Sequence, residues 1–357
     1  MLRKNLFTAI AVLAVCNVKA QDSTKTLTVT GSLDAYYRYN FSGKMNNYTS
    51  FTNSQNSFEL GMASVKLEGT ALKGKVGATV DIGYGRRAEE FSYNDGEAAA
   101  GKNGFASLSV LKQVFVTYSP SSTIKITAGK FATHVGYELL DAGLNRNYSM
   151  GYMFTNGPFF HTGIKADITA GPVAFMVGVS NYNDETTTTT AAKSLIAQFS
   201  GGTKNEKLKF YLNYAGFFGP DSSLNPNELN KLNQIDLVVT GKISKKFNIA
   251  YNGTVQSRKL QTGLKGTWWG SALYFNYDPS EKAGLTLRSE IIEDNSLIYF
   301  GTKSIFANTF SVNYKIGPLT IIPELRFENS KTNIYTKKDG NGASSTMSAL
   351  LAAVYKF

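Results

Sequence analysis

Apolar and polar residues alternate with a period of two along most of the chain. In the segment 27–41, Leu33 and Tyr37 lie on one face. Asp34 and Arg38 lie on the opposite face. This period predicts β-strands, because successive side chains of a strand point to opposite sides. The chain is therefore expected to be all-β.

The same pattern divides the chain into about sixteen strands. Most are near or somewhat above the roughly 9–11 residues that a tilted membrane strand needs. The predicted strands are 27–41, 57–70, 76–85, 108–119, 123–131, 158–169, 172–182, 192–201, 207–218, 232–243, 246–257, 264–278, 284–294, 304–316, 318–329 and 345–357.

Two of these strands carry irregularities. In the second strand the apolar positions change from even to odd numbers after Met62. A β-bulge near Ala63 and Ser64 would restore the register. In the last strand but one, Pro323 cannot donate a hydrogen bond to the ladder. We therefore expect a bulge or a local break in the ladder at Pro323.

The connections between the predicted strands alternate between long and short. The long ones lie near 42–56, 86–107, 132–157, 219–231 and 330–344. Short periplasmic turns with longer external loops are typical of outer-membrane barrels. A soluble β-sandwich, the alternative fold, would not require this alternation. The pattern therefore predicts a closed antiparallel transmembrane β-barrel, because backbone groups in lipid must all be paired.

The first twenty residues have the layout of a secretory signal peptide. A basic start precedes a mostly apolar run from Leu6 to Cys16. The segment ends in the small-residue pattern Val18-Lys19-Ala20. The apolar run is too short to cross about 30 Å of hydrocarbon as a helix. We therefore expect a signal peptide at 1–20 and one barrel domain at 21–357.

Cysteine content and charge limit the possible chemistry. Cys16 is the only cysteine and lies within the predicted signal peptide, so a disulfide framework is excluded from the rest of the chain. The formal charge of +11 falls to +8 without that peptide, with 34 basic residues against 26 acidic ones. The basic residues are scattered among carboxylates, so a nucleic-acid partner is not expected.

The last predicted strand ends in aromatic residues. Tyr355 and Phe357 share its apolar face, and Phe357 is the final residue. This ending resembles the terminal strand that the barrel-insertion machinery of Gram-negative bacteria recognises. We expect Tyr355 and Phe357 to form this membrane-insertion signal. The alternative is an ordinary buried last strand.

Five short motifs follow one another along the mature chain. They are Gly31–Asn40, Gly129–Glu138, Asn156–Lys165, Leu287–Glu290 and Ile322–Phe327. In order and spacing they resemble the OmpL-like β-barrel porins of Gram-negative outer membranes. The resemblance implies a passive pore in the outer membrane and does not name a solute.

The polar face of each strand is expected to line the lumen. Lys or Arg on the lipid face would cost roughly 2–4 kcal/mol at the bilayer centre. Five of the candidates, on the first, thirteenth and fifteenth strands, allow two interpretations. They form either a mixed ring that sets a field across the channel or ion pairs that stabilise the wall. The predicted pore-lining residues are Asp34, Arg38, Lys125, His161, Lys165, Lys209, Arg288, Glu290, Glu324 and Arg326.

The long connection 132–156 is the candidate constriction loop. It follows the motif Gly129–Phe131 and is rich in Gly, Asn and Tyr. We expect it to fold inward and narrow the pore, as the third external loop does in many porins. Its candidate residues are His134, Tyr137, Glu138, Asp141 and Arg146.

These features predict a porin for small hydrophilic solutes, with a modest preference for anions because the chain without its signal peptide carries +8 and the inward lysines and arginines together outnumber the inward carboxylates. The expected partners are outer-membrane lipid and the insertion machinery, with a homo-oligomer as an option. The alternative is a non-conducting barrel that serves as an adhesion or assembly scaffold, which a narrow or plugged lumen would favour.

An enzyme is not expected. The chain has two histidines and lacks a Gly-x-Ser-x-Gly elbow, a His-Glu-x-x-His motif and a phosphate-binding loop. No residue spacing supports a metal site, and no cofactor is predicted.

Overall fold

The computed structural model describes residues 25–92, 108, 110–188, 192–219, 229–260, 262–297 and 300–357. The predicted signal peptide at 1–20 lies outside these residues. Among the described helices, none is both long enough and apolar enough to cross a membrane.

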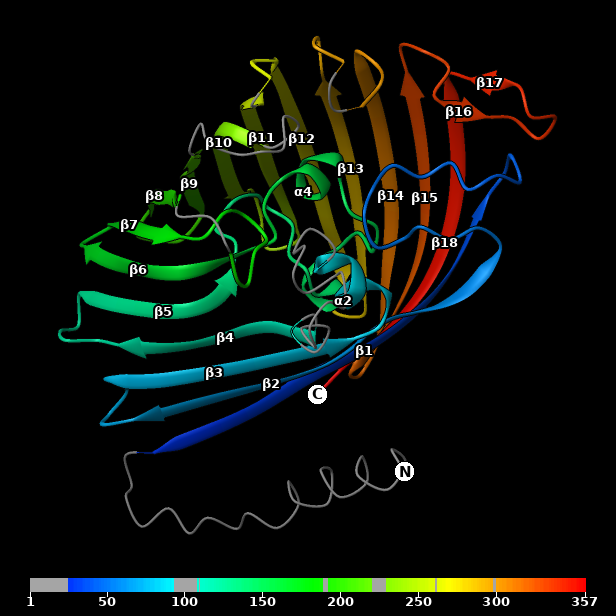
Figure 1. Ribbon diagram of the computed structural model, residues 1–357. Helices are drawn as coiled ribbons and strands as arrows, with labels where there is room; N and C mark the ends of the chain where they lie inside the picture. Colours follow the sequence, from blue (N-terminus) through cyan, green and yellow to red (C-terminus); the bar gives the residue numbers. More distant parts are fainter. Residues whose placement is uncertain are drawn as a thin grey trace, which may run out of the picture.

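Sixteen antiparallel strands close into one barrel (Figure 1). Each strand pairs with its neighbours in sequence, and β18 closes the ring between β15 and β1. The expected number and order of strands are confirmed. The barrel strands are β1 Thr26–Asn40, β2 Ser57–Ala71, β3 Val76–Tyr84, β4 Leu111–Tyr118, β5 Ile124–Ala132, β6 Phe160–Ala170, β7 Val173–Ser180, β8 Ser194–Gly202, β9 Leu208–Phe218, β10 Leu229–Lys242, β11 Phe247–Leu260, β12 Lys265–Ser280, β13 Ala283–Glu293, β14 Ser304–Ile316, β15 Leu319–Ser330 and β18 Ser345–Lys356.

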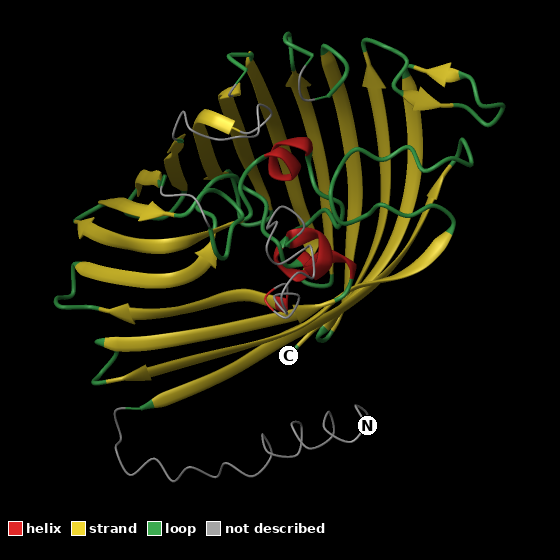
Figure 2. Cartoon of the chain, in the orientation of Figure 1, coloured by secondary structure: helices red, strands yellow, loops and turns green. Residues whose placement is uncertain are grey.

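The remaining elements belong to the connections. They are α2 Arg86–Phe91, the 3-10 helix η2 Ala142–Leu144, α4 Tyr152–Asn156, and the two-stranded sheet of β16 Tyr335–Thr336 and β17 Gly342–Ala343. Figure 2 shows the helices inside the ring of strands. The β16–β17 hairpin instead projects beyond the rim of the barrel (Figure 1).

The two faces of the wall differ in polarity. Outward side chains such as Leu212 of β9 and Ile235 of β10 are exposed and apolar. Inward side chains such as Asn213, Asp236 and Asn252 are buried and polar. In this group the Asn213 and Asn252 amides donate to the Asp236 carboxylate at 2.8 and 2.6 Å. An apolar outside with a polar inside is the arrangement that a bilayer requires of a barrel.

The strands run between two different ends. Short connections join β2–β3, β4–β5, β6–β7, β8–β9, β10–β11, β12–β13 and β14–β15, and the antiparallel order brings them to one end, here called the short-turn end. The long connections lie at the opposite, long-loop end. In two of the two-residue turns, Gly171 and Gly317 have φ of 62° and 58°, a left-handed conformation that glycine adopts without steric cost.

The bulge in β2 lies at Gly61, two residues before the predicted position. Asp34 of β1 pairs with Met62, and the next residue of β1 pairs with Leu60. Leu60 is therefore exposed, whereas Met62 is completely buried. The assignment of Met62 to the lipid face was wrong, because the extra residue precedes it and reverses its direction.

Pro323 interrupts one ladder without shifting it. Pairing between β14 and β15 stops at Ser311↔Glu324 and resumes at Tyr314↔Ile321 in the same register. On its other side, β15 pairs continuously with β18 through Pro323↔Leu351. Proline lacks an N–H group, so the expected local break occurs on one side of the strand only.

Candidate functional site

The loop between β5 and β6, residues 133–159, folds into the barrel and is here called the inserted loop. It contains η2 and α4, and Figure 1 shows α4 within the ring of strands. Its first part contacts the wall at β10 and β11. Gly136 N donates to the Asp236 carboxylate at 3.0 Å, and Tyr137 N donates to the Asn252 amide oxygen at 3.2 Å. The Tyr137 ring packs against Tyr274, with centroids 4.3 Å apart.

The middle of the inserted loop reaches the opposite part of the wall. Asn147 donates to Ser311 Oγ at 2.7 Å, and Tyr148 N donates to Glu324 Oε2 at 2.9 Å. The Tyr148 hydroxyl donates to the carboxylate of Asp34 on β1. Because its contacts run from β10 to β1, the loop crosses the lumen rather than following one side of it.

Two further ion pairs tie the loop to the wall at β12 and β4. Arg146 forms a bidentate pair with Asp278 of β12, at 2.8 and 2.7 Å, and both side chains are partly exposed. Asp141 pairs with Lys112 of β4 at 2.6 Å, and Lys112 also pairs with Asp81 at 3.0 Å. The register of β4 slips by one residue at Lys112, which places its side chain inside the barrel.

A buried network of charges lies at the centre of the lumen. Arg288 of β13 pairs with Glu138 of the inserted loop and with Glu290 of β13. Arg326 of β15 pairs with Glu290 at 3.3 Å and with Glu328 at 2.8 Å. All five side chains are at most 6% exposed. An unpaired charge buried this far from solvent would destabilise the folded protein. Each of these five side chains is therefore stabilised by its oppositely charged partners.

The network also holds the backbone of the inserted loop. Arg288 Nη1 donates to Ser149 O at 2.7 Å, and Arg326 Nη1 donates to Met150 O at 2.9 Å. Tyr152 N donates in return to Glu290 Oε2 at 2.8 Å. The predicted group of Arg38, Arg288, Glu290, Glu324 and Arg326 is therefore divided. Arg288, Glu290 and Arg326 pair together, whereas Glu324 binds the loop.

Arg38 is occupied by the first long loop, residues 41–56. Its guanidinium donates to Ser54 O and Asn46 O, both at 2.8 Å.

Arg87 of α2 is also buried. Its guanidinium lies between the rings of Phe51 and Tyr148, with its central carbon 5.1 Å from each ring centroid. Three long connections therefore meet inside the barrel.

The two histidines lie together on the inner side of the wall. Their ring centroids are 5.3 Å apart, and Thr133 Oγ1 lies 3.2 Å from His161 Nε2. His134 Nε2 lies 3.0 Å from Tyr214 O, so the neutral ring donates there. Burial lowers the pKa of His134 to about 4, against the opposing effect of this hydrogen bond. His134 is therefore neutral near pH 7.

The remaining candidate pore-lining residues lie near the short-turn end. Lys165 pairs with Asp167 at 3.2 Å, and Lys209 pairs with Glu206 at 3.3 Å. Lys125 is exposed. The structure thus separates the predicted lumen residues into a central arginine–carboxylate group and a group of lysines near one mouth.

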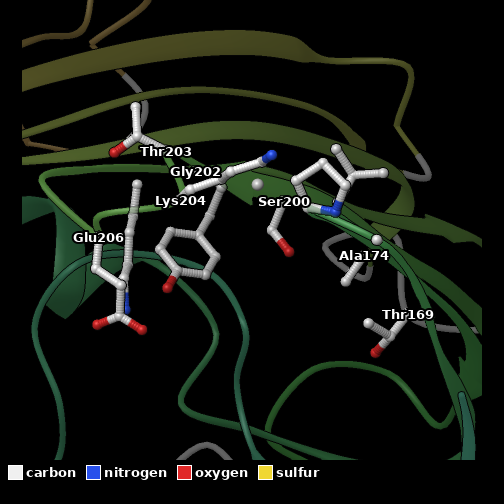
Figure 3. Close-up of a pocket in the computed structure, with 13 residues that line it drawn as sticks. Thr169, Ala174, Ser200, Gly202, Thr203, Lys204 and Glu206 are labelled. Carbon is white, nitrogen blue, oxygen red and sulfur yellow. The ribbon is translucent and has the colours of Figure 1, made fainter.

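Two adjoining hollows occupy this mouth. One, of 600 Å³, is lined by Ser200, Lys204, Glu206 and Lys209 among others (Figure 3). The other, of 620 Å³, is lined by Lys73, Lys75, Lys125, Asp167 and the serines of the β4–β5 turn. Thr169 lines both hollows, so they are neighbours at that residue.

The C-terminal aromatic residues lie at the end of β18, on the outer face of the barrel. Tyr355 and Phe357 are exposed, with ring centroids 6.4 Å apart. Phe357 exchanges two backbone hydrogen bonds of 3.0 Å with Gly31 of β1. A Cβ at Gly31 would lie 2.3 Å from the Phe357 ring, so glycine leaves room for the aromatic side chain.

Among the described residues of the lumen, sequence reasoning missed Lys112, Glu328, Arg87 and Tyr148, which take part in the contacts above. Glu328 has the same inward phase as the predicted Arg326, so alternation could have found it. The bulge concealed the direction of Lys112. Arg87 and Tyr148 lie in connections, where no period indicates which way a side chain points. Within the described ranges, no three His, Cys, Asp or Glu side chains gather to hold a metal ion.

A closed barrel of sixteen strands with a polar lumen and an inserted loop is a porin-like barrel. The chain belongs to the family described as "Putative beta-barrel porin-2, OmpL-like", whose model matches residues 26–357. A search of curated proteins found no match.

Solved outer-membrane proteins share the fold at low sequence identity. The outer membrane channel DcaP of Acinetobacter baumannii aligns with a TM-score of 0.65 at 10% identity, covering 94% of this chain and 99% of that one. An anion-selective porin from Comamonas acidovorans gives 0.63 at 12%, covering 93% and 100%. OmpT of Vibrio cholerae gives 0.59 at 10%, covering 94% and 99%. Family and fold together indicate an outer-membrane location.

Proposed function

We propose that the chain forms a channel for passive diffusion of small hydrophilic solutes across the outer membrane of a Gram-negative bacterium. The observation that carries this proposal is the closed barrel of sixteen strands with a polar inner wall. Barrels of eight strands are filled by their own side chains, whereas barrels of 16–18 strands leave room for an aqueous channel. A diffusion channel requires no catalytic residue.

In this proposal the inserted loop is the constriction. Its backbone and side chains cross the lumen and bind the wall on both sides. The candidate constriction residues and the inward residues of the wall would then determine the size and field of the passage. The short-turn end would face the periplasm, as short turns do in outer-membrane barrels.

A modest preference for anions accompanies the function. The mature chain has a surplus of basic residues, and the central arginines are matched by carboxylates. Lysines near the short-turn end provide the remaining positive charge, which raises the local concentration of anions. One fold neighbour is an anion-selective porin from Comamonas acidovorans, which agrees with this preference.

The proposed partners follow from the outer surface. Exposed apolar side chains on the wall suit outer-membrane lipid, and Tyr355 with Phe357 suits recognition by the insertion machinery. A homo-oligomer is included in the proposal, because OmpT of Vibrio cholerae, a neighbour in fold, has been solved in a trimer form.

Planar bilayers test the proposal directly. Folded protein added from detergent should produce discrete steps of conductance. In a KCl gradient, the sign of the reversal potential should show that chloride permeates somewhat better than potassium. Heat-denatured protein in the same detergent is the control. A cation-selective potential would remove the anion preference and leave the channel intact.

A non-conducting scaffold is the second candidate function. It is favoured by the contacts between the inserted loop and the wall at the centre, where one hollow beside Arg38, Glu324 and Arg326 measures 10 Å³. Folded protein that inserts into bilayers but never conducts would support this candidate over the channel.

A further inference from the structure

We propose that the anion preference originates at the short-turn mouth, in a cluster of unpaired lysines that attracts small multivalent anions and makes conduction asymmetric. The cluster, here called the mouth lysines, consists of Lys73, Lys75, Lys125 and Lys204. This inference rests on the proposed channel function and locates its selectivity.

The centre of the lumen carries little free positive charge. Four buried arginines face five buried carboxylates there. Their contacts with one another and with loop carbonyls leave the centre close to neutral. The members are Arg38, Arg87, Arg288 and Arg326, with Asp34, Glu138, Glu290, Glu324 and Glu328.

The mouth lysines differ from their neighbours in having no countercharge. Lys209, which lines the same hollow as Lys204, forms an ion pair with Glu206. None of the four mouth lysines forms an ion pair with any residue in the described part of the chain. Lys73, Lys75 and Lys125 line one hollow, and Lys204 lines the adjoining one. Figure 3 shows Lys204 beside Glu206, whose carboxylate is paired with Lys209.

Uncharged donors accompany these lysines. The hollow of Lys73, Lys75 and Lys125 is also lined by Ser119, Ser121, Ser122 and Thr123. The hollow of Lys204 is also lined by Ser200 and Thr203. Hydroxyl groups can donate hydrogen bonds to carboxylate, sulfate or phosphate oxygens. Each hollow is large enough to admit a small hydrated anion beside the lysines that line it.

The expected electrical consequence is asymmetry. Fixed positive charge at one mouth raises the local anion concentration on that side only. The effect extends over roughly 10 Å at 0.1 M salt and 3 Å at 1 M salt. The current should therefore depend on voltage polarity at 0.1 M KCl by about twofold and become nearly symmetric at 1 M KCl. Divalent anions should be attracted more strongly than chloride, because attraction increases with charge.

The test compares matched charge removals at the two ends. One variant replaces the four mouth lysines with glutamine. The control variant replaces four exposed lysines of the long loops, Lys44, Lys331, Lys337 and Lys338, with glutamine. Three of these control lysines flank or lie within the β16–β17 hairpin, which projects away from the lumen (Figure 1). The heat-dependent mobility shift of each variant on gels checks that its barrel is folded.

Orientation is fixed through a single cysteine. The mature chain contains no cysteine, so Asn341→Cys in the hairpin gives one site for a biotin–streptavidin adduct. The adduct cannot cross the bilayer, and the long-loop end therefore stays on the side of addition. Millimolar sodium sulfate is then added to one compartment at a time during chloride conduction.

We expect sulfate to reduce the chloride current of the wild type mainly from the short-turn side. In the mouth variant, a several-fold higher sulfate concentration should be needed, the polarity asymmetry should disappear, and the anion preference should fall. The control variant should behave as the wild type. If the channels conduct and the mouth variant responds to sulfate and to voltage polarity as the control variant does, this inference is wrong and the channel function stands. Folded protein that never conducts would overturn both the inference and the channel function.

Discussion

Arg288 of the barrel wall forms an ion pair with Glu138 of the inserted loop, and both side chains are almost completely shielded from solvent. The same guanidinium donates to the carbonyl oxygens of Ser149 and Met150. One wall residue thus holds the loop at two points, by charge at its beginning and by hydrogen bonds near its middle.

Replacing Arg288 with methionine should release the inserted loop. The change leaves Glu138 without its cation, and breaking a buried pair in this way costs about 3–5 kcal/mol. We expect higher or noisier single-channel conductance and faster proteolysis of the loop. Arg146→Gln is the control, because its pair with Asp278 is partly exposed and should contribute no more than about 1 kcal/mol. Equal effects of the two changes would contradict the central role of Arg288.

Shortening the inserted loop tests whether it is the constriction. Replacing residues 139–149 with a short Gly–Ser linker removes the contacts of Tyr148 and Asn147 with the wall. Single-channel conductance should rise severalfold, because a central obstruction is lost. Removing only the exposed tip of the β16–β17 hairpin, residues 337–341, is the matched control and should leave conductance unchanged, since this tip projects beyond the rim of the barrel (Figure 1). Unchanged conductance after loop shortening would exclude the loop as the constriction.

The strands could be predicted from the sequence because lipid and lumen impose opposite polarity on alternate residues. All sixteen barrel strands overlap the predicted ranges. The alternation fails where one extra residue reverses a strand locally, as at Gly61 and Lys112. A bulge depends on contacts with other parts of the chain, so the period alone places it only approximately.

The partners inside the lumen were not predictable from local pattern. Tyr148 binds Asp34 across 114 positions of sequence, and nothing near either residue indicates the other. Alternation showed that Asp34 points inward but gave no information about the loop that meets it. Likewise, it did not separate Lys209, which is paired, from Lys204, which forms no ion pair with any described residue, because pairing depends on side-chain geometry.

Gly61 should be intolerant of a larger side chain. A Cβ there would lie 1.7 Å from Asp34 Oδ1 and 2.3 Å from the Tyr148 hydroxyl oxygen. Gly61→Ala must therefore displace the buried Tyr148–Asp34 hydrogen bond, at a cost of about 1–3 kcal/mol. Gly69→Ala in the same strand is the control, because its nearest neighbour would be 3.9 Å away. The midpoint of heat-induced unfolding in detergent should fall for Gly61→Ala only.

Acid should loosen the first part of the inserted loop through His134. The pKa of this residue is about 4 in the folded protein, below the ordinary value of 6.5, because of burial. Between these values the unfolded segment binds more protons than the folded one. The stabilisation is therefore complete above pH 6.5 and is lost as the pH falls toward 4, by no more than about 3 kcal/mol.

Protease sensitivity of the inserted loop, followed from pH 7.5 to pH 4.5, measures this effect. His134→Gln keeps a donor for Tyr214 O but cannot take up a proton, so its loop should lose less protection in acid than the wild type. His161→Gln is the companion variant, since the two rings lie 5.3 Å apart. If His161→Gln removes the acid response and His134→Gln does not, the titrating group is His161, and the assignment to His134 is wrong.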